Sequence, residues 1–207
     1  MILFFYLRRF LFALLLLLAT GATAVSSTAS ASTQEWPGLF IPPEYRDAAA
    51  ELAKQDNGQA VEERLLEAGL AFVFPDTSLA PLQRENFHDL ENRAADQKRG
   101  LWQKERYQIK DALDIAALLQ QRDSLQIVRG TVYATALQTE FLYLNFEEDW
   151  RRDFTIGIPR TDLRHFRRAQ LSPEDWTGKT VEVRGWLTSW NGPFITVTHP
   201  VQIRILD

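Results

Sequence analysis

The side chains that most often carry enzyme chemistry are scarce in this sequence of 207 residues, which has no cysteine and three histidines. The absence of cysteine excludes disulfide bonds, thiolate metal ligands and thiol nucleophiles. The histidines, His88, His165 and His199, stand far apart and lack the short spacing typical of metal ligands. We therefore predict no metal site and no cofactor. The chemistry that remains is that of carboxylates, guanidinium groups and aromatic rings.

One acidic segment lies beside two arginines and a tryptophan: Glu147, Glu148, Asp149, Trp150, Arg151, Arg152 and Asp153. Several carboxylate oxygens could hold a calcium ion, because hard cations prefer oxygen ligands. The regular ligand spacing and the glycine turn of a calcium loop are absent, however. We interpret the segment as a hairpin loop whose acidic side chains pair with the neighbouring arginines.

A second segment is basic and contains Arg160, Arg164, His165, Arg167 and Arg168. Arg164 and Arg168 are four residues apart, so on a helix they share one face. Such a face could contact phosphate groups, and each contact would add salt-sensitive affinity. The alternative is a solvated face that pairs in part with acidic residues, which the net charge of −4 favours.

Aromatic residues on a predicted strand suggest a binding platform. The alternation in residues 181–188 puts apolar side chains on one face and Glu182, Arg184 and Trp186 on the other. A tryptophan beside an arginine on a polar face is typical of a surface on which nucleic-acid bases stack. The aromatic residues that could extend this surface are Tyr143, Trp150 and Trp190. The alternative, which we favour for Trp186 itself, is that it packs under the helical half as a plug between domains.

The N-terminal segment, residues 1–31, has the pattern of a secretory signal peptide. Arg8 and Arg9 precede an apolar run at 10–18, and Ala29-Ser30-Ala31 forms a cleavage site. The apolar residues before the arginines leave an uncleaved membrane anchor as the alternative. No cysteine stands at the cleavage site, so we expect no lipid anchor. The predicted location is the periplasm or the exterior of the cell.

Charge and hydrophobic period divide the remaining chain into two halves. Residues 32–123 hold 11 basic and 17 acidic residues, whereas 124–207 hold 10 of each. The first half has helical periodicity, with helices predicted at Ala48–Lys54, Ala60–Ala68, Leu82–Arg99 and Asp111–Gln121. The second half alternates with period two, with strands predicted at Leu125–Ala134, Phe141–Phe146, Asp153–Ile158, Thr180–Thr188, Phe194–His199 and Val201–Leu206. One helix, Thr161–Gln170, interrupts the strands.

We therefore predict an α+β protein in which a helical N-terminal half, residues 32–123, precedes a small OB-like β-barrel, residues 124–207. Three strands, a helix, a hairpin around Asn191-Gly192 and a terminal strand follow the order of that barrel.

Two stretches of the helical half resemble the end of a staphylococcal-nuclease-like (thermonuclease) domain. Val61–Ala71 is similar to the family helix that closes in L-x-x-x-G-L-A, and Leu90–Trp102 to its last helix, which ends in G-L-W. The second half resembles the carboxy-terminal extension of some bacterial members, in Tyr143–Phe146, Trp150–Thr155, Val183–Trp186 and Gly192–Pro200. The resemblance implies descent from an enzyme that cuts phosphodiesters with calcium, acidic residues and two arginines.

The sequence departs from that family where the chemistry would lie. The D-x-Y-G-R segment of the family corresponds to Lys54–Gln59, which has no arginine. The D-x-P-E segment corresponds to Leu39–Glu44, where Ile41 stands at the aspartate position and only Glu44 matches. The residues between the signal segment and Glu44 are too few for the barrel strands of a catalytic site. We therefore expect a truncated nuclease-like remnant with no catalytic residues.

The function predicted from the sequence is that of an exported, non-catalytic binding protein. The predicted binding residues are Trp186, Arg184, Tyr143, Trp150, Arg151, Arg152, Arg164 and Arg168. The expected partner is single-stranded nucleic acid, and oligosaccharides are a second ligand class that OB-like barrels bind. The first alternative is residual calcium-dependent phosphodiesterase activity that uses Glu44 and the acidic loop. The second is a structural module that docks on another envelope protein.

Overall fold

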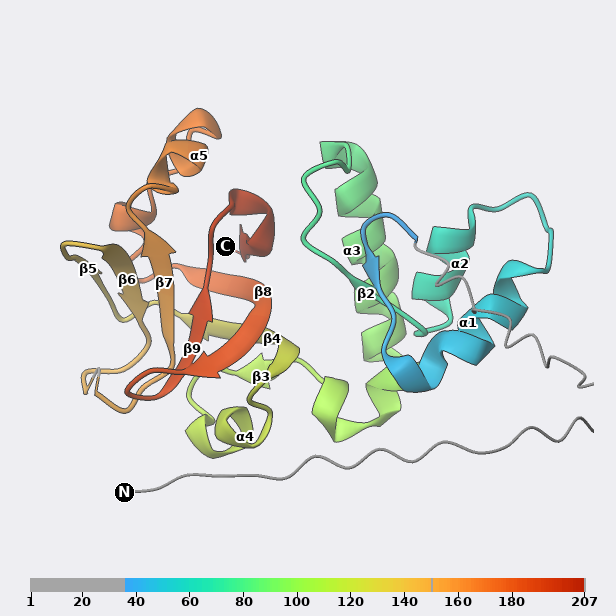
Figure 1. Ribbon diagram of the computed structural model, residues 1–207, viewed down its shortest axis with the longest axis horizontal. Coiled ribbons are helices and arrows are strands. Elements are labelled where there is room, and N and C mark those ends of the chain that lie inside the picture. The colour runs from blue at the N-terminus through green and yellow to red at the C-terminus, as the bar shows by residue number, and fades with distance from the viewer. Residues whose placement is uncertain (1–35, 150, 207) are drawn as a thin grey trace, which may run out of the picture. The chain divides into compact units, whose positions relative to one another are not determined.

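The computed structural model describes residues 36–149 and 151–206 (Figure 1). The predicted signal peptide and Trp150 lie outside the described residues. The described residues belong to one structural unit. None of the helices that they form is both long and apolar enough to cross a membrane.

The N-terminal part of this unit contains three α-helices, short 3-10 helices and two short strands, seen on the blue-to-green side of Figure 1. Their bounds are β1 (Leu39–Phe40), α1 (Arg46–Ala53), α2 (Val61–Glu67), β2 (Phe72–Val73) and α3 (Pro81–Asp96). The helices overlap the predicted helical stretches, and their apolar faces meet in a core that includes Leu65, Leu66, Phe87 and Leu90. Gly69 ends α2 with a φ of 66°. A side chain there would place its Cβ 2.4 Å from the carbonyl oxygen of Arg99, so glycine is required.

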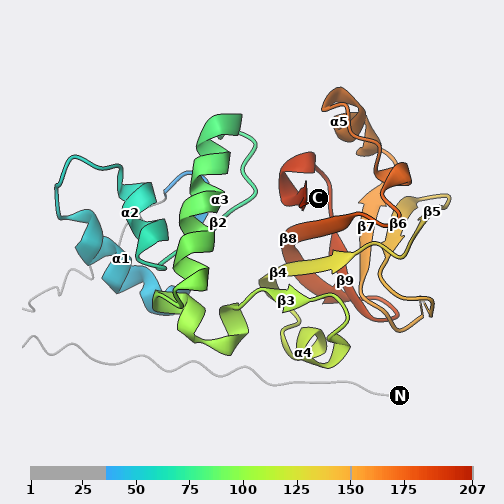
Figure 2. The ribbon, with the colours of Figure 1, turned by 180° about the vertical axis from the view of Figure 1, so that it is seen from behind.

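The C-terminal part forms a small barrel. The bounds of its elements are β3 (Lys110–Asp111), α4 (Ile115–Gln120), β4 (Ser124–Thr131), β5 (Ala134–Leu137), β6 (Phe141–Asn145), β7 (Thr155–Pro159), α5 (Leu163–Arg168), β8 (Thr180–Ser189), β9 (Pro193–Thr196) and β10 (Ile203–Ile205). Of these, β4, β6, β7, β8, β9 and β10 overlap the predicted strands, whereas β3 and most of β5 were not predicted as strands. Figure 2 shows β3, β4 and β8 from the opposite side. The helix predicted at Thr161–Gln170 is shorter, since α5 begins at Leu163 and ends at Arg168.

The pairing of the strands confirms an OB-like barrel. The sheet has the order β3-β4-β8-β9-β7-β6-β5, with β10 paired to β8; the pairs β3 with β4 and β7 with β9 are parallel, and the other pairs are antiparallel. The single strand predicted at Leu125–Ala134 is interrupted at residues 132 and 133: the N–H of Val132 still donates to the carbonyl of Lys179, just before β8, whereas the N–H of Tyr133 donates to the carbonyl of Asn145 in β6. This bend lets one chain segment pair with β8 through β4 and with β6 through β5. Counted as one bent strand, it closes a barrel of five strands.

The alternating pattern of the strands fills the barrel interior. Leu142 and Leu144 of β6, Ile156 and Ile158 of β7, and Val183 of β8 are all buried in one cluster. Side chains at the intervening positions point out of the barrel. The exterior of the barrel therefore carries the residues available for binding, except where the helical part covers it.

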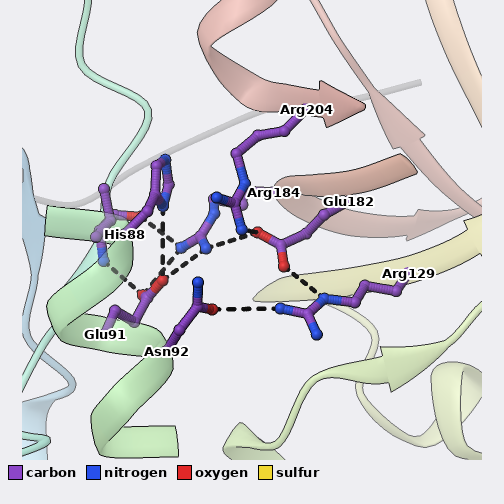
Figure 3. Close-up of polar contacts among 8 residues, drawn as sticks. His88, Glu91, Asn92, Arg129, Glu182, Arg184 and Arg204 are labelled. Atoms are coloured by element: carbon purple, nitrogen blue, oxygen red, sulfur yellow. Dashed lines mark hydrogen bonds and ion pairs between the residues drawn. The ribbon is translucent and has the colours of Figure 1, made fainter. Parts of the chain in front are cut away.

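A buried charged cluster joins α3 to the outer face of β8 (Figure 3). Arg184 lies between Glu91 of α3, at 2.6 Å, and Glu182 of its own strand, at 2.7 Å. Arg129 of β4 and Arg204 of β10 lie 2.6 Å and 2.9 Å from Glu182. Burial alone would raise the pKa of Glu182, but the guanidinium groups of Arg184, Arg204 and Arg129 outweigh burial and lower it to about 2.

This cluster corrects two expectations about β8. The side chain of Arg184 is 2% exposed, so its guanidinium group is part of a buried ion pair and not of an open binding face. The expectation that Trp186 packs between the barrel and the helical part is wrong, because this residue is 57% exposed. The residue that joins the two parts at this face is Arg184, because buried carboxylates on both sides compensate its charge.

Candidate functional site

A cavity of about 450 Å³ opens on the outer face of the barrel. Its lining comes from β5, β6, β7 and β9 and from the loops at 138–140 and 190–192: Ala136, Gln138, Tyr143, Asn145, Thr155, Trp190, Asn191 and Phe194. We call it the barrel cavity. The size is within the range of natural ligand sites.

Aromatic rings form much of the barrel cavity and its floor. The ring of Trp190 lies 6.2 Å from that of Phe194, and Phe141 lies 6.3 Å from Phe194 and 5.7 Å from Tyr143. This packing of the rings requires a glycine at position 157 of β7, because a Cβ there would lie 2.3 Å from the ring of Phe194. Trp190 is 60% exposed, so much of its side chain is open to a ligand.

The hairpin of β8 and β9 positions Trp190. Asn191 has a φ of 60°, a conformation that asparagine tolerates better than most residues, and Gly192 follows it. The N–H of Trp190 donates to the carbonyl of Gly192 across this tight turn. The predicted Asn191-Gly192 hairpin is therefore confirmed, and it holds the tryptophan at the rim of the barrel cavity.

The polar side-chain groups of the barrel cavity are the amides of Gln138, Asn145 and Asn191, the hydroxyls of Tyr143 and Thr155 and the indole N–H of Trp190, and none carries a formal charge. The hydroxyl of Thr155 donates to Oδ1 of Asp153 at 2.9 Å and lies 3.4 Å from Oδ1 of Asn145. The side chains of Gln138, Asn145 and Asn191 each carry one acceptor oxygen and a donor nitrogen. These groups can form hydrogen bonds with a neutral, hydrogen-bonding ligand face such as a nucleic-acid base or a sugar.

The acidic loop between β6 and β7 has a structural anchor in Asp153. Its buried carboxylate accepts from the backbone N–H of Phe146 at 2.8 Å and of Glu147 at 3.2 Å. Burial raises the pKa of Asp153, and these hydrogen bonds oppose the rise. Asp149 lies 3.9 Å from Arg151 and 3.4 Å from Arg152, the pairing that the hairpin-loop interpretation expects.

Arg160 contacts the lining of the barrel cavity, and Arg151 and Arg152 belong to the loop before β7, where the backbone of Arg152 approaches Gly192. Arg160, which follows β7, donates to the carbonyl of the lining residue Gln138 at 3.4 Å. Arg151 and Arg152 are exposed in the loop between β6 and β7. Exposed ion pairs such as Arg152 with Asp149 contribute little free energy, so these side chains can exchange partners with a ligand.

The predicted binding residues fall into separate places. Tyr143 lines the barrel cavity, whereas Trp186 is exposed on β8 and does not belong to its lining. Arg164 is exposed on α5 and its Nε lies 3.4 Å from Nε2 of His165. Arg168, on the same helix, lines a second cavity that is described below. Trp150 lies outside the described residues.

Glu44, the one match to the family's acidic motif, is engaged by neighbouring side chains. The hydroxyl of Tyr107 donates to its carboxylate, and Lys104 and Arg106 lie 3.9 Å and 3.7 Å from the same oxygen. The hydrogen bond from Tyr107 is the main cause of a lowered pKa for Glu44. Among the described residues, no three acidic or histidine side chains are grouped so that they could hold a metal ion.

Sequence reasoning missed most of the lining. Asn145 and Thr155 stand on predicted strands, and Asn145 shares the strand face of Tyr143 because the two are two residues apart. The same alternation could have identified Asn145. The contribution of Gln138 and Phe194 depends on pairing between distant strands, which the sequence alone does not specify.

Comparisons with known proteins give the chain no family. No family model matches the sequence, and no curated protein matches it. Among solved structures, the chain is similar to an aspartyl tRNA synthetase from Entamoeba histolytica, with a TM-score of 0.35 and 12% identity over 45% of this chain and 21% of that one. An asparaginyl-tRNA synthetase of the same organism, in complex with asparaginyl-adenylate, gives 0.32 and 14% over 47% and 23%.

The S. pombe Stn1-Ten1 complex gives a TM-score of 0.29 and 16% identity, over 40% of this chain and 57% of that one. The chain spans less than two thirds of the length of each of these three structures. At such low scores the likeness carries no functional conclusion, and the fold assignment rests on the strand order.

Proposed function

We propose that this protein binds single-stranded nucleic acid in the barrel cavity. One observation carries the proposal: the cavity lies at the place where OB-like barrels take oligonucleotides. That place is the face of the second and third barrel strands, here β6 and β7, between the first and last hairpin loops. Gln138 comes from the first of these loops and Trp190 from the last.

Two rings supply the stacking surfaces. The half-buried Tyr143 and the exposed Trp190 both line the cavity, and Phe194 supports Trp190 from below. Stacking a base on an aromatic side chain contributes about 1–3 kcal/mol, and every base has a flat face that can stack. The amides of Asn145 and Asn191 are placed to contact base edges, which are exposed in a single strand and paired in a duplex.

The distribution of charge in and around the barrel cavity fits the binding of a single strand better than that of a duplex. The lining carries no charged residue, so the neutral bases enter the cavity and the phosphates stay outside. Arg151, Arg152 and Arg160 are the residues that would meet those phosphates. With three such contacts, the logarithm of the binding constant should fall with the logarithm of salt concentration with a slope of about −2.

We further propose that the protein acts without cleaving its ligand and is exported. The departures from the thermonuclease motifs at Lys54–Gln59 and Leu39–Glu44 support the first point. The contacts of Glu44 with Tyr107, Lys104 and Arg106 also support it, because they occupy the carboxylate that would have to activate water. The signal pattern in residues 1–31 supports export, and N-terminal sequencing of the protein from its native cell would test whether it is removed.

The test of the binding proposal is a titration of the full chain with a labelled single-stranded DNA or RNA of mixed sequence, read by fluorescence anisotropy. We expect saturable binding that Tyr143→Ala weakens about 5- to 100-fold, which corresponds to the loss of one stacked base. Tyr133→Ala is the matched control, because Tyr133 is 54% exposed and is not part of the lining. It should change the affinity less than about twofold.

A parallel titration with neutral oligosaccharides separates the two ligand classes. Binding of an oligosaccharide, together with no binding of either nucleic acid, would overturn the proposal in favour of the other class that OB-like barrels take. Cleavage of the labelled strand in calcium, abolished by Glu44→Gln, would overturn the non-catalytic part. Failure with all of these ligands, with capture of a single envelope protein that Tyr143→Ala prevents, would favour the structural module.

A further inference from the structure

The three histidines of the sequence meet at one cavity, although they are far apart along the chain. His88 comes from α3, His165 from α5, and His199 from the turn before β10. All three line a cavity of about 790 Å³ between α3 and the end of the barrel, and the rings of His165 and His199 are 5.1 Å apart. We call it the histidine cavity. It shares no lining residue with the barrel cavity.

Arginines from three different elements line the same cavity. They are Arg84 of α3, Arg168 of α5 and Arg204 of β10, and they face one acidic lining residue, Glu85. Even with neutral histidines, the described lining therefore has an excess of positive charge. The neighbouring buried cluster does not remove this excess, since apart from Arg204 it contains two arginines, Arg129 and Arg184, and two glutamates, Glu91 and Glu182.

Two of these guanidinium groups are held in place by the protein. Arg84 donates through Nη2 to the carbonyl oxygen of Leu79 at 2.8 Å, and Arg204 donates through Nη2 to Glu182 at 2.9 Å. The Nε atoms of both arginines are buried and have no hydrogen-bond partner. Guanidinium groups that the protein already holds in place lose little side-chain entropy when an anion binds.

The third unusual group is His88, which is 3% exposed. Its Nδ1 is buried without a hydrogen-bond partner and lies 3.8 Å from Glu91, while the other ring nitrogen points away from Glu91 (Figure 3). Burial lowers the pKa of His88; the carboxylate of Glu91 opposes this, and Arg184 and Arg204 add to it. The neutral ring therefore lies beside the positive charges of Arg184 and Arg204, which a bound anion would offset.

His199 is in a similar situation. Burial lowers its pKa, and the neighbouring side chains of His165 and Arg84 lower it further. Its Nδ1 already accepts from the N–H of Val201, so Nε2 is the nitrogen left for a ligand. With three arginines nearby, and no grouping of three ligands for a metal among the described residues, the histidines are suited to an anion and not to a cation.

We propose that the histidine cavity is a binding site for a phosphate group, either free or carried by a small molecule. A tetrahedral dianion matches the excess of positive charge, and guanidinium groups donate to phosphate oxygens in a fixed fork geometry. The imidazole rings contribute further donors when they take up a proton. The cavity is large enough for a group of nucleotide size beside the phosphate.

The test uses the full chain and inorganic phosphate, with proton NMR of the histidine rings as the readout. Because the chain has three histidines, their C–H signals can be assigned with one substitution each. Phosphate should shift all three signals saturably, with half-saturation at about 1 mM or below, relative to chloride at equal ionic strength. The double variant His165→Gln/Arg168→Gln should weaken binding at least about tenfold. Arg167→Gln is the matched control, since Arg167 is exposed on the same helix and is not in the lining.

Two outcomes of these titrations would overturn the proposal. If the histidine signals do not shift saturably in the unaltered protein, the proposal fails, whatever the variants do. If Arg167→Gln weakens binding as much as the double variant, the effect is unspecific charge and the proposal also fails. Titration with a nucleoside 5′-monophosphate then separates the sources. Tighter binding than that of phosphate assigns a nucleotide ligand, and equal binding assigns the phosphate itself.

Discussion

Two guanidinium nitrogens of Arg184 lie 2.9 Å and 2.6 Å from the two carboxylate oxygens of Glu91, although 93 residues separate them in the sequence. The strand β2 completes this contact, because the N–H of Val73 donates to Glu91 at 2.8 Å and its carbonyl accepts from Arg184 at 3.3 Å. A barrel strand, a helix and a short strand of the N-terminal part are thereby tied together at one buried point.

Substituting Arg184 by methionine should destabilise the protein by about 3–5 kcal/mol, because it leaves the carboxylate of Glu91 buried without its cation. Urea unfolding, followed by circular dichroism, measures the change in the free energy of unfolding. Arg152→Met is the control, since its side chain is 86% exposed and should cost less than about 1 kcal/mol. A loss below about 1 kcal/mol for Arg184→Met would show that the cluster does not hold the two parts together.

The acid stability of the protein should depend on Glu182. Its pKa is lowered to about 2 in the folded state from an ordinary value of 4.5, so its ionised form favours folding. This stabilisation is fully present above pH 4.5 and is lost as the pH falls through about 2. The difference in unfolding free energy between the unaltered protein and Glu182→Gln should therefore shrink over that interval. A difference that stays constant down to pH 2 would contradict the assignment.

The floor of the barrel cavity should be sensitive to one added methyl group. Gly157→Ala would place a Cβ 2.3 Å from the ring of Phe194, so the ring must move. We expect a cost of about 1–3 kcal/mol in unfolding free energy and weaker binding of single-stranded DNA. Phe194→Leu in the same chain should recover part of the stability, because it removes the atom that clashes. If the double variant is no more stable than the sum of the two single effects predicts, the proposed contact is not the cause.

Anion binding in the histidine cavity should strengthen as the pH falls from 8 to about 6, because histidines titrate in that range. The pKa values of His88 and His199 are lowered in the free protein, and an anion would raise them, so binding takes up protons. The groups that face these two rings are Glu91, Arg184 and Arg204 around His88, and His165 and Arg84 around His199.

Sulfate is a suitable probe for that pH dependence, since its own charge does not change over this range. Calorimetry in two buffers of different ionisation enthalpy counts the protons that are taken up. An affinity for sulfate that is independent of pH would show that the histidines do not take part.

The sequence pattern predicted most elements of the fold because burial on one face leaves a period that can be read locally. The alternation around Leu142 and Leu144 located β6, and Asn191-Gly192 located the hairpin between β8 and β9. The interruption at residues 132 and 133 was missed, since it depends on a change of partner from Lys179, which pairs with Val132, to Asn145, which pairs with Tyr133.

Contacts between distant elements limited the prediction of the sites. Glu182 and Arg184 alternate with apolar residues and were therefore expected to face solvent, but Glu91 of α3 pairs with Arg184, and arginines of three strands surround Glu182. The spacing of the three histidines in the sequence does not indicate a shared site, because three separate elements bring them to one cavity. Such pairings are decided by tertiary packing and leave no local periodicity.

The central claim is that the exposed ring of Trp190 stacks on a single-stranded ligand, and two tryptophans of nearly equal exposure allow a direct test. Trp190 is 60% exposed and lines the barrel cavity, whereas Trp186 is 57% exposed and does not. The measurement is the dissociation constant of a single-stranded oligonucleotide without terminal phosphates for Trp190→Ala and Trp186→Ala. We predict a loss of about tenfold or more for Trp190→Ala and less than about twofold for Trp186→Ala. Equal losses, or a larger loss for Trp186→Ala, would contradict the account.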